Sequence, residues 1–174
     1  FHWMKSWQFF LTRCLESIEN QSFKDYEVIL MKVGSMPKTS NRVIQGARGE
    51  LIKILYLDDY FLYSTSLEQM VNYFNSHESK WLICGTDDNQ MPQWTDNIET
   101  GNNKLGSPSA LMFMNDKPLL FDERMSWLLD CDLYRRLYDT YGEPKILDSI
   151  EIGIGLGDHQ VTNIMTDDEK LKEF

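Results

Sequence analysis

The sequence from residue 49 to residue 59 is GELIKILYLDD, an apolar run that ends in two adjacent aspartates. Residues 52–57 predict a buried β-strand, because short runs of Ile, Leu and Tyr are typical of strands inside a sheet. Asp58 and Asp59 follow at the strand end where open α/β sheets bind ligands. Carboxylate oxygens are the ligands that Mg²⁺ and Mn²⁺ prefer. We therefore expect a metal or ligand contact here, with a turn of solvated acids as the alternative.

Helical and strand-like patterns alternate on both sides of this run. Apolar residues at helical spacing and short apolar runs define the expected elements. The expected helices cover residues 6–20, 40–48, 67–76 and 126–141, and the expected strands cover residues 26–31, 52–57, 81–84, 110–114 and 145–147. Residues 85–108 are rich in Gly, Asn, Asp and Thr and predict a long loop. The order favours an α/β class with a mostly parallel central sheet flanked by helices, an α/β/α sandwich.

Composition limits the class of partner. The chain has 174 residues, of which 42% are hydrophobic and 25% charged, so we expect one globular domain over residues 1–174. Its formal charge of −10 argues against a nucleic-acid partner and implies a divalent cation if the substrate is anionic. No apolar run is long enough for a transmembrane segment. The three cysteines stand far apart, which indicates a reducing, cytoplasmic location. The oligomeric state stays open.

Three further positions are candidates for chemistry. Asp130 is expected in the first turn of its helix, where the helix dipole favours an ionised carboxylate of the kind a general base needs. A charge that only complements the dipole is the alternative. Asp132 is two residues away and should face elsewhere. The pair Asp87-Asp88 is a rival metal site, and His159 follows three glycines as a ligand or proton carrier, although a lone histidine is more often neither.

Four segments in order resemble the family 2 glycosyltransferases of GT-A fold. Residues 15–29 are similar to a CLxSIxxQxxxDYEVI segment, and residues 49–59 to the strand that ends in the family's DxD motif. Residues 106–110, followed by residues 121–123, are similar to its acceptor-side strand and loop, and residues 129–137 to its EDxELxxRL helix. The family's first strand, of the VSVIIPTYN type, has no counterpart here, so we expect a single GT-A-like domain that starts after it.

The resemblance implies transfer of a sugar from a nucleotide-diphosphate-sugar donor to an acceptor hydroxyl on a glycan or other molecule, usually with inversion. It implies Mn²⁺ or Mg²⁺ on Asp58 and Asp59, with His159 as a third ligand. These two aspartates, with Lys32 and Asn41, are the expected donor-binding residues, and Asp130 is the expected catalytic base. The resemblance also suggests that the C-terminal segment closes over the donor.

Two departures keep other functions open. The family has a base-reading Asp where this chain has residues 31–35, and it has a Glu where this chain has Leu129. These departures motivate a second hypothesis, a non-catalytic domain of the same fold that binds a nucleotide sugar or a protein. A nucleotidyltransferase shares the acid and metal chemistry, but no basic, glycine-rich loop supports it.

Overall fold

The computed structural model describes residues 2–88, 91–157 and 160–173. Its helices are α1 (His2–Glu19), α2 (Met36–Gly46), α3 (Ser66–Ser76), α4 (Leu129–Tyr141), α5 (Val161–Ile164) and α6 (Asp167–Lys170). Its strands are β1 (Leu51–Lys53), β2 (Tyr60–Phe61), β3 (Trp81–Thr86), β4 (Leu111–Met114) and β5 (Lys145–Gly153). Short 3-10 turns cover Ile98–Thr100, Pro108–Ala110 and Leu171–Glu173. The expected helices are all present, with shifted ends.

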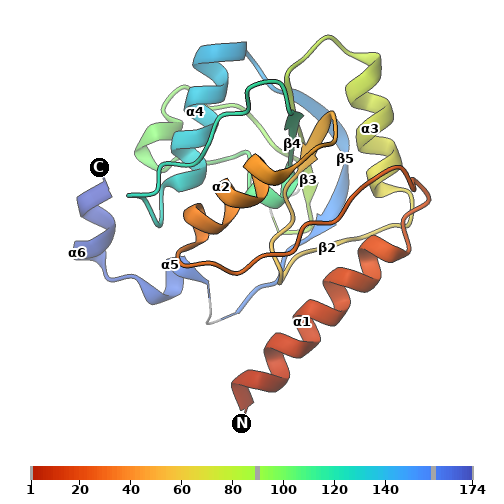
Figure 1. Cartoon of the computed structure of the whole chain (residues 1–174). Helices are drawn as coiled ribbons and strands as arrows, with labels where there is room; N and C mark the ends of the chain where they lie inside the picture. Colours follow the sequence, from red (N-terminus) through yellow and green to blue (C-terminus); the bar gives the residue numbers. More distant parts are fainter. Residues whose placement is uncertain (1, 89–90, 158–159, 174) are drawn as a thin grey trace.

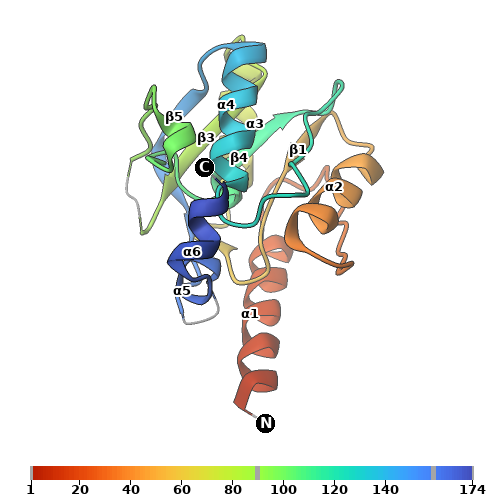
Figure 2. The ribbon, with the colours of Figure 1, turned by 90° about the vertical axis from the view of Figure 1, so that its left-hand side faces the viewer.

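The five strands form one sheet in the order β1-β4-β3-β5-β2 (Figures 1 and 2). Strand β4 lies between β1 and β3 and runs antiparallel to both, and β2 runs antiparallel to β5. Only β3 and β5 pair in parallel within the described part of the chain. The α/β class and the central sheet with flanking helices are confirmed. The expectation of mostly parallel pairing is wrong, because β4 and β2 each join their neighbours in the reverse direction.

The strand expected at residues 26–31 is also wrong. This segment has no regular secondary structure and belongs to no ladder among the described residues. Val28 and Leu30 are 51% and 62% exposed, so its apolar side chains are not buried as an inner strand requires. An apolar run becomes a strand only where a neighbouring strand takes up its backbone hydrogen bonds, and no such neighbour lies beside it in the described chain.

The core forms where α3 and α4 cover opposite faces of the sheet (Figures 1 and 2). Strand β3 is buried along its whole length, and Trp81 at its start is fully buried. The ring of Tyr134 on α4 stacks on Trp81 with the centroids 6.1 Å apart. Trp94 of the long loop stacks on Tyr138 at 4.1 Å, so it is used in packing. These contacts fix α4 against the sheet.

Helix α1 leaves the body of the molecule at its N-terminal end (Figure 2). Its C-terminal end is anchored by Gln21, whose side chain donates to the carbonyl oxygen of Tyr63 and accepts from the backbone N–H of Leu67. Phe9, nearer the N-terminus, is 60% exposed. Among the described residues, no helix is both long and apolar enough to cross a membrane.

Candidate functional site

The two aspartates after β1 sit in a tight turn. Of the strand expected at residues 52–57, only Ile52 and Lys53 pair in the sheet, as part of β1. The backbone then turns so that the N–H of Asp59 donates to the carbonyl of Tyr56 at 3.0 Å. Arg13 of α1 donates to the carbonyl oxygen of Asp58 at 2.6 Å. Helix α1 therefore fixes the backbone of this turn from outside the sheet.

Asp59 is turned inward and is only 3% exposed. Its Oδ1 accepts the backbone N–H of Gly155 at 2.9 Å, and its Oδ2 lies 3.5 Å from the hydroxyl of Ser107. Burial raises the pKa of Asp59 to about 6, and the neighbouring charge of Asp58 adds to the rise. Asp58 is partly exposed, so it is the more accessible of the two carboxylates.

The segment after β5 lies directly against this turn. A Cβ atom on Gly155 would lie 2.6 Å from the Cβ of Asp58, and one on Gly153 would lie 2.6 Å from the ring atom Cε1 of Tyr60. Real Cβ atoms do not approach other atoms so closely. The two glycines therefore permit the C-terminal segment to close over the aspartate turn, which explains the Gly-x-Gly spacing there.

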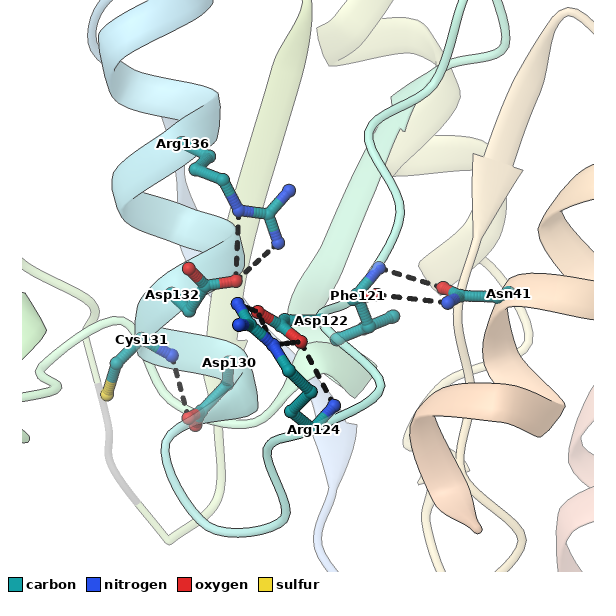
Figure 3. A network of polar contacts seen from close by, with 8 residues as sticks. All are labelled: Asn41, Phe121, Asp122, Arg124, Asp130, Cys131, Asp132 and Arg136. Carbon is teal, nitrogen blue, oxygen red and sulfur yellow. Dashed lines mark hydrogen bonds and ion pairs between the residues drawn. The ribbon is translucent and has the colours of Figure 1, made fainter. Parts of the chain in front are cut away.

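Asp130 lies in the first turn of α4, as expected (Figure 3). Its Oδ1 accepts the backbone N–H of Cys131 at 2.8 Å, and its Oδ2 accepts from Nδ2 of Asn103 at 2.8 Å. Burial raises the pKa of Asp130, and these hydrogen bonds oppose the rise. The carboxylate is thus held by donors on both oxygens.

Asp132 does not join Asp130. Its carboxylate is ion-paired with Arg136 one turn along α4, as Figure 3 shows. In the preceding loop, Arg124 pairs with Asp122 and lowers the pKa of that carboxyl well below its usual range. Both pairs are satisfied within the protein, which leaves Asp130 as the acid of this region without an ionic partner in the contacts described.

The amino end of α4 is closed by a side chain from the C-terminal turn. The carboxylate of Glu173 accepts the backbone N–H groups of Ser126, Trp127 and Leu128 at 2.8–2.9 Å. Lys170 lies over the ring of Trp127, with its Nζ 5.6 Å from the centroid. The C-terminal segment therefore contacts both acidic regions, at the aspartate turn through Gly155 and at α4 through Glu173.

One loop links the two acidic regions. Asn103 binds Asp130, and Ser107 approaches Asp59. Because these two loop residues are four positions apart, their Cα atoms lie within about 14 Å of each other. Asp59 and Asp130 are therefore brought to the same end of the molecule although 71 positions separate them, as 130 − 59 gives.

The pKa of Tyr56 gives a second indication of where the three predicted acids lie. Burial raises its pKa, and the carboxylates of Asp130, Asp59 and Asp58 raise it further. A carboxylate has this effect only when it is near, because the interaction weakens with distance. All three predicted acids therefore lie within electrostatic range of Tyr56, whose hydroxyl oxygen is buried.

Asn41 has a clear structural partner. Its amide forms two hydrogen bonds with the backbone of Phe121, donating to the carbonyl at 3.0 Å and accepting from the N–H at 2.8 Å (Figure 3). Its Nδ2 also lies 3.2 Å from a carboxylate oxygen of Glu123. Asn41 thus joins α2 to the loop before α4. Its role in donor binding stays a prediction.

The other predicted ligand-binding residues lie elsewhere or outside the described chain. Lys32 is exposed, and its Nζ lies 5.0 Å from the ring centroid of Trp7 on α1. His159 lies outside the described residues. In the rival pair, Asp87 accepts the backbone N–H of Ile154 at 2.8 Å and so helps to end β5.

The residues present fit a divalent cation in part. No group of three His, Cys, Asp or Glu side chains within residues 2–88, 91–157 and 160–173 is arranged to hold a metal ion. Mg²⁺, however, is commonly held by one or two carboxylates together with substrate phosphates. Asp58 offers an accessible oxygen ligand of this kind, and the buried Asp59 lies beside it.

Sequence reasoning missed three residues that shape this site, Asn103, Ser107 and Gly155. Asn103 begins an Asn-x-x-Gly sequence that ends at Gly106, where φ is +88°. Asparagine and a glycine of positive φ together are typical of a turn whose side chain folds back on its own backbone. This local signal could have predicted the turn. It could not have predicted that the turn contacts Asp130.

The fold and these contacts define a GT-A-like α/β architecture. Solved structures of TarS from S. aureus, a GT-A-like glycosyltransferase, share it. TarS residues 1–349 match with a TM-score of 0.64, 16% identity and 85% of this chain covered. The TarS complexes with UDP and with UDP-GlcNAc each match with a TM-score of 0.66, at 15% and 14% identity and with 87% and 90% of this chain covered.

This likeness, at such low identity, establishes the fold alone. The chain spans 57–58% of the length of these three TarS chains. No family model matches the sequence, and no curated protein matches it. The expected GT-A-like fold is therefore confirmed through structure, while membership of family 2 stays a prediction.

Proposed function

We propose that this chain is a glycosyltransferase domain that moves a sugar from a nucleotide-diphosphate-sugar donor to an acceptor hydroxyl, with inversion and with Mn²⁺ or Mg²⁺. The observation that carries the proposal is that one loop contacts two of the acids: Asn103 binds Asp130, and Ser107 approaches Asp59, which adjoins Asp58. The shared fold with TarS, which has been solved with UDP and UDP-GlcNAc, supports a nucleotide-sugar donor.

The donor diphosphate would bind at the aspartate turn. Asp58 is the accessible carboxylate and would hold the divalent ion together with phosphate oxygens, and Asp59 would fix the turn from beneath. When bound, such an ion offsets the negative charge of the leaving diphosphate. A chain of net charge −10 needs this compensation to hold an anionic donor.

Asp130 would act as the general base. It takes the proton of the acceptor hydroxyl as that oxygen forms its bond to the anomeric carbon and the bond to the leaving diphosphate breaks. Burial raises the pKa of Asp130, which brings its basicity closer to that needed near neutral pH. The two hydrogen bonds on its oxygens hold it in one orientation.

We also propose that the chain acts as one domain over residues 1–174 in the cytoplasm. The three cysteines, Cys14, Cys84 and Cys131, are free and buried, which supports a reducing compartment. The acceptor is a glycan or another hydroxyl-bearing molecule.

The second candidate is a domain of the same fold that binds a nucleotide sugar without turnover. The burial of Asp59 favours it, because a carboxylate that is 3% exposed and hydrogen-bonded to Gly155 offers a metal few free lone pairs. Calorimetric titration with a panel of nucleotide sugars, with and without Mn²⁺, separates the two. Binding without release of nucleoside diphosphate for any donor and acceptor would favour this candidate.

The test of the proposed function compares Asp130→Asn with Asp132→Asn. Both changes remove one carboxylate from the first turn of α4, but Asp132 is ion-paired with Arg136. D130N should lower the rate of sugar transfer by about 10²–10⁴-fold, as loss of a general base does. D132N should retain transfer. Full transfer activity in D130N would show that the base is wrongly assigned.

A further inference from the structure

The amide of Asn103 makes four hydrogen bonds in a fixed orientation. Its Oδ1 accepts the backbone N–H groups of Leu105 and Gly106 at 2.8 and 3.1 Å. Its Nδ2 donates to the carbonyl of Gly106 at 3.0 Å and to Oδ2 of Asp130 at 2.8 Å. Because two donors face one end of the amide and two acceptors face the other, the opposite orientation would lose all four bonds.

The loop that carries Asn103 is anchored on both sides. Leu105 is 1% exposed, so its side chain packs in the core and anchors the loop. The carbonyl of Gly106 also accepts from the hydroxyl of Tyr134 at 3.2 Å, and Tyr134 is fully buried on α4. Helix α4 therefore holds the loop that in turn holds Asp130. Because α4 and the loop are joined at both Gly106 and Asp130, the distance between the Asn103 amide and the Asp130 carboxylate is fixed.

Three side chains near Asp130 carry no positive charge, so the ionised carboxylate depends on neutral hydrogen-bond donors. The thiol of Cys131 and the phenols of Tyr134 and Tyr56 lie near it, and burial raises the pKa of each, so all three are uncharged near neutral pH. None of these neighbours compensates the charge of the carboxylate. Donors that bind the ionised form, such as Asn103 and the N–H of Cys131, favour that form over the protonated one.

We propose that Asn103 is the positioning residue for Asp130: its amide binds Oδ2, favours the ionised carboxylate over the protonated one and fixes its orientation. The role in catalysis rests on the proposed function, whereas the positioning itself rests on the contacts of the amide. Asn103 acts through Asp130 and needs no contact with a substrate.

The substitution Asn103→Asp tests this role. It keeps an acceptor oxygen for Leu105 and Gly106, and it replaces Nδ2, which donates to Asp130 and to the carbonyl of Gly106, with a second carboxylate oxygen. The matched control is Asn102→Asp, the same chemical change one residue earlier. Asn102 is exposed and bonds to Asn97 and Thr95.

The decisive readout is the titration of the Asp130 carboxyl carbon by NMR, assigned with D130N. N103D should raise its midpoint by about one pH unit or more, because a like charge disfavours ionisation. N102D should leave the midpoint unchanged. If N103D does not fold, N103S serves instead: its hydroxyl is too short to reach Asp130, and the midpoint should rise by less. An unchanged midpoint in the folded variant would overturn the proposal.

A pH profile of sugar transfer supplies the functional readout. In N103D the acid limb of kcat/KM should move to higher pH, with transfer recovering as the pH rises, whereas a purely structural role would lower transfer equally at all pH values. An acid limb that stays in place would overturn the proposal. If the NMR midpoint shifts but the wild-type chain transfers no sugar, the proposed function fails and the positioning of Asp130 by Asn103 stands.

Discussion

The aspartate turn and the start of α4 hold their carboxylates in different ways. At the turn, the C-terminal segment lies over Asp59 so closely that only glycine fits at residue 155. At α4, a side-chain amide from a loop reaches Asp130, and the carboxylate of Glu173 closes the helix end. The carboxylate at the turn is held by close contact with the backbone, whereas the carboxylate at α4 is held by a side-chain hydrogen bond.

This difference indicates a division of roles between the two regions. A carboxylate locked under a backbone segment, such as Asp59, mainly fixes the position of the turn. A carboxylate held by two neutral donors, such as Asp130, keeps a defined orientation, which suits the proposed general base.

Gly155→Ala should have the largest effect on stability. The new Cβ would lie 2.6 Å from the Cβ of Asp58, and overpacking of this kind costs about 3 kcal/mol. Urea unfolding measures the loss. The control is Gly46→Ala, because a Cβ on Gly46 in α2 meets only a side-chain atom of Ile29 at 4.0 Å. Equal stability of the two variants would contradict close packing at the turn.

Asp59 should make the metal-free protein less stable as the pH rises from about 4 to 7. Burial raises its pKa from 3.8 to about 6 in the folded state, so the folded protein holds this proton after the unfolded chain has released it. The cost is absent at low pH and approaches about 3 kcal/mol near pH 7, because a pKa unit corresponds to about 1.4 kcal/mol.

Unfolding of wild-type protein and Asp59→Asn across this pH range measures the effect. The wild type should lose stability relative to the variant as the pH rises. Parallel stability profiles would show that Asp59 is not desolvated in the folded state.

Glu173→Gln should have the smallest effect, about 1 kcal/mol, which is typical for loss of a helix cap. The amide can accept with one oxygen only, whereas the carboxylate accepts three N–H groups from residues 126–128. Hydrogen exchange of these three amides should accelerate in E173Q. The control is Asp168→Asn on α6, which removes the same charge from an exposed position. Unchanged exchange rates in E173Q would show that the carboxylate of Glu173 does not protect the amino end of α4.

The long, periodic elements of the fold were predictable from the sequence. Apolar spacing placed α1, α3 and α4, and the apolar runs placed β3 and β4. Strand β5 was predicted too short because Asp148, Ser149 and Glu151 interrupt its apolar pattern. Strand β2 has only two residues and leaves no pattern. Strand direction depends on pairing between distant segments, so local patterns could not predict the antiparallel β4.

Of the candidate site, only the acidic residues could be predicted from the sequence. Asp58 and Asp59 were recognisable because they follow an apolar strand, and Asp130 because it begins a helix. The inward rotation of Asp59 depends on Gly155, which is 96 positions away. The amide that holds Asp130 comes from a loop 27 positions earlier. Contacts of this range carry no local signal, although Asn103 and Gly106 mark a turn.

Calorimetric titration of UDP-GlcNAc into wild-type protein and Asp58→Asn, with and without Mn²⁺, tests the claim that the three acids form one nucleotide-sugar site. TarS, which shares this fold, has been solved with that donor. We expect Mn²⁺ to strengthen binding to the wild type and to have little effect on D58N, because the variant lacks the accessible carboxylate. Equal binding by both proteins, unaffected by Mn²⁺, would contradict the claim.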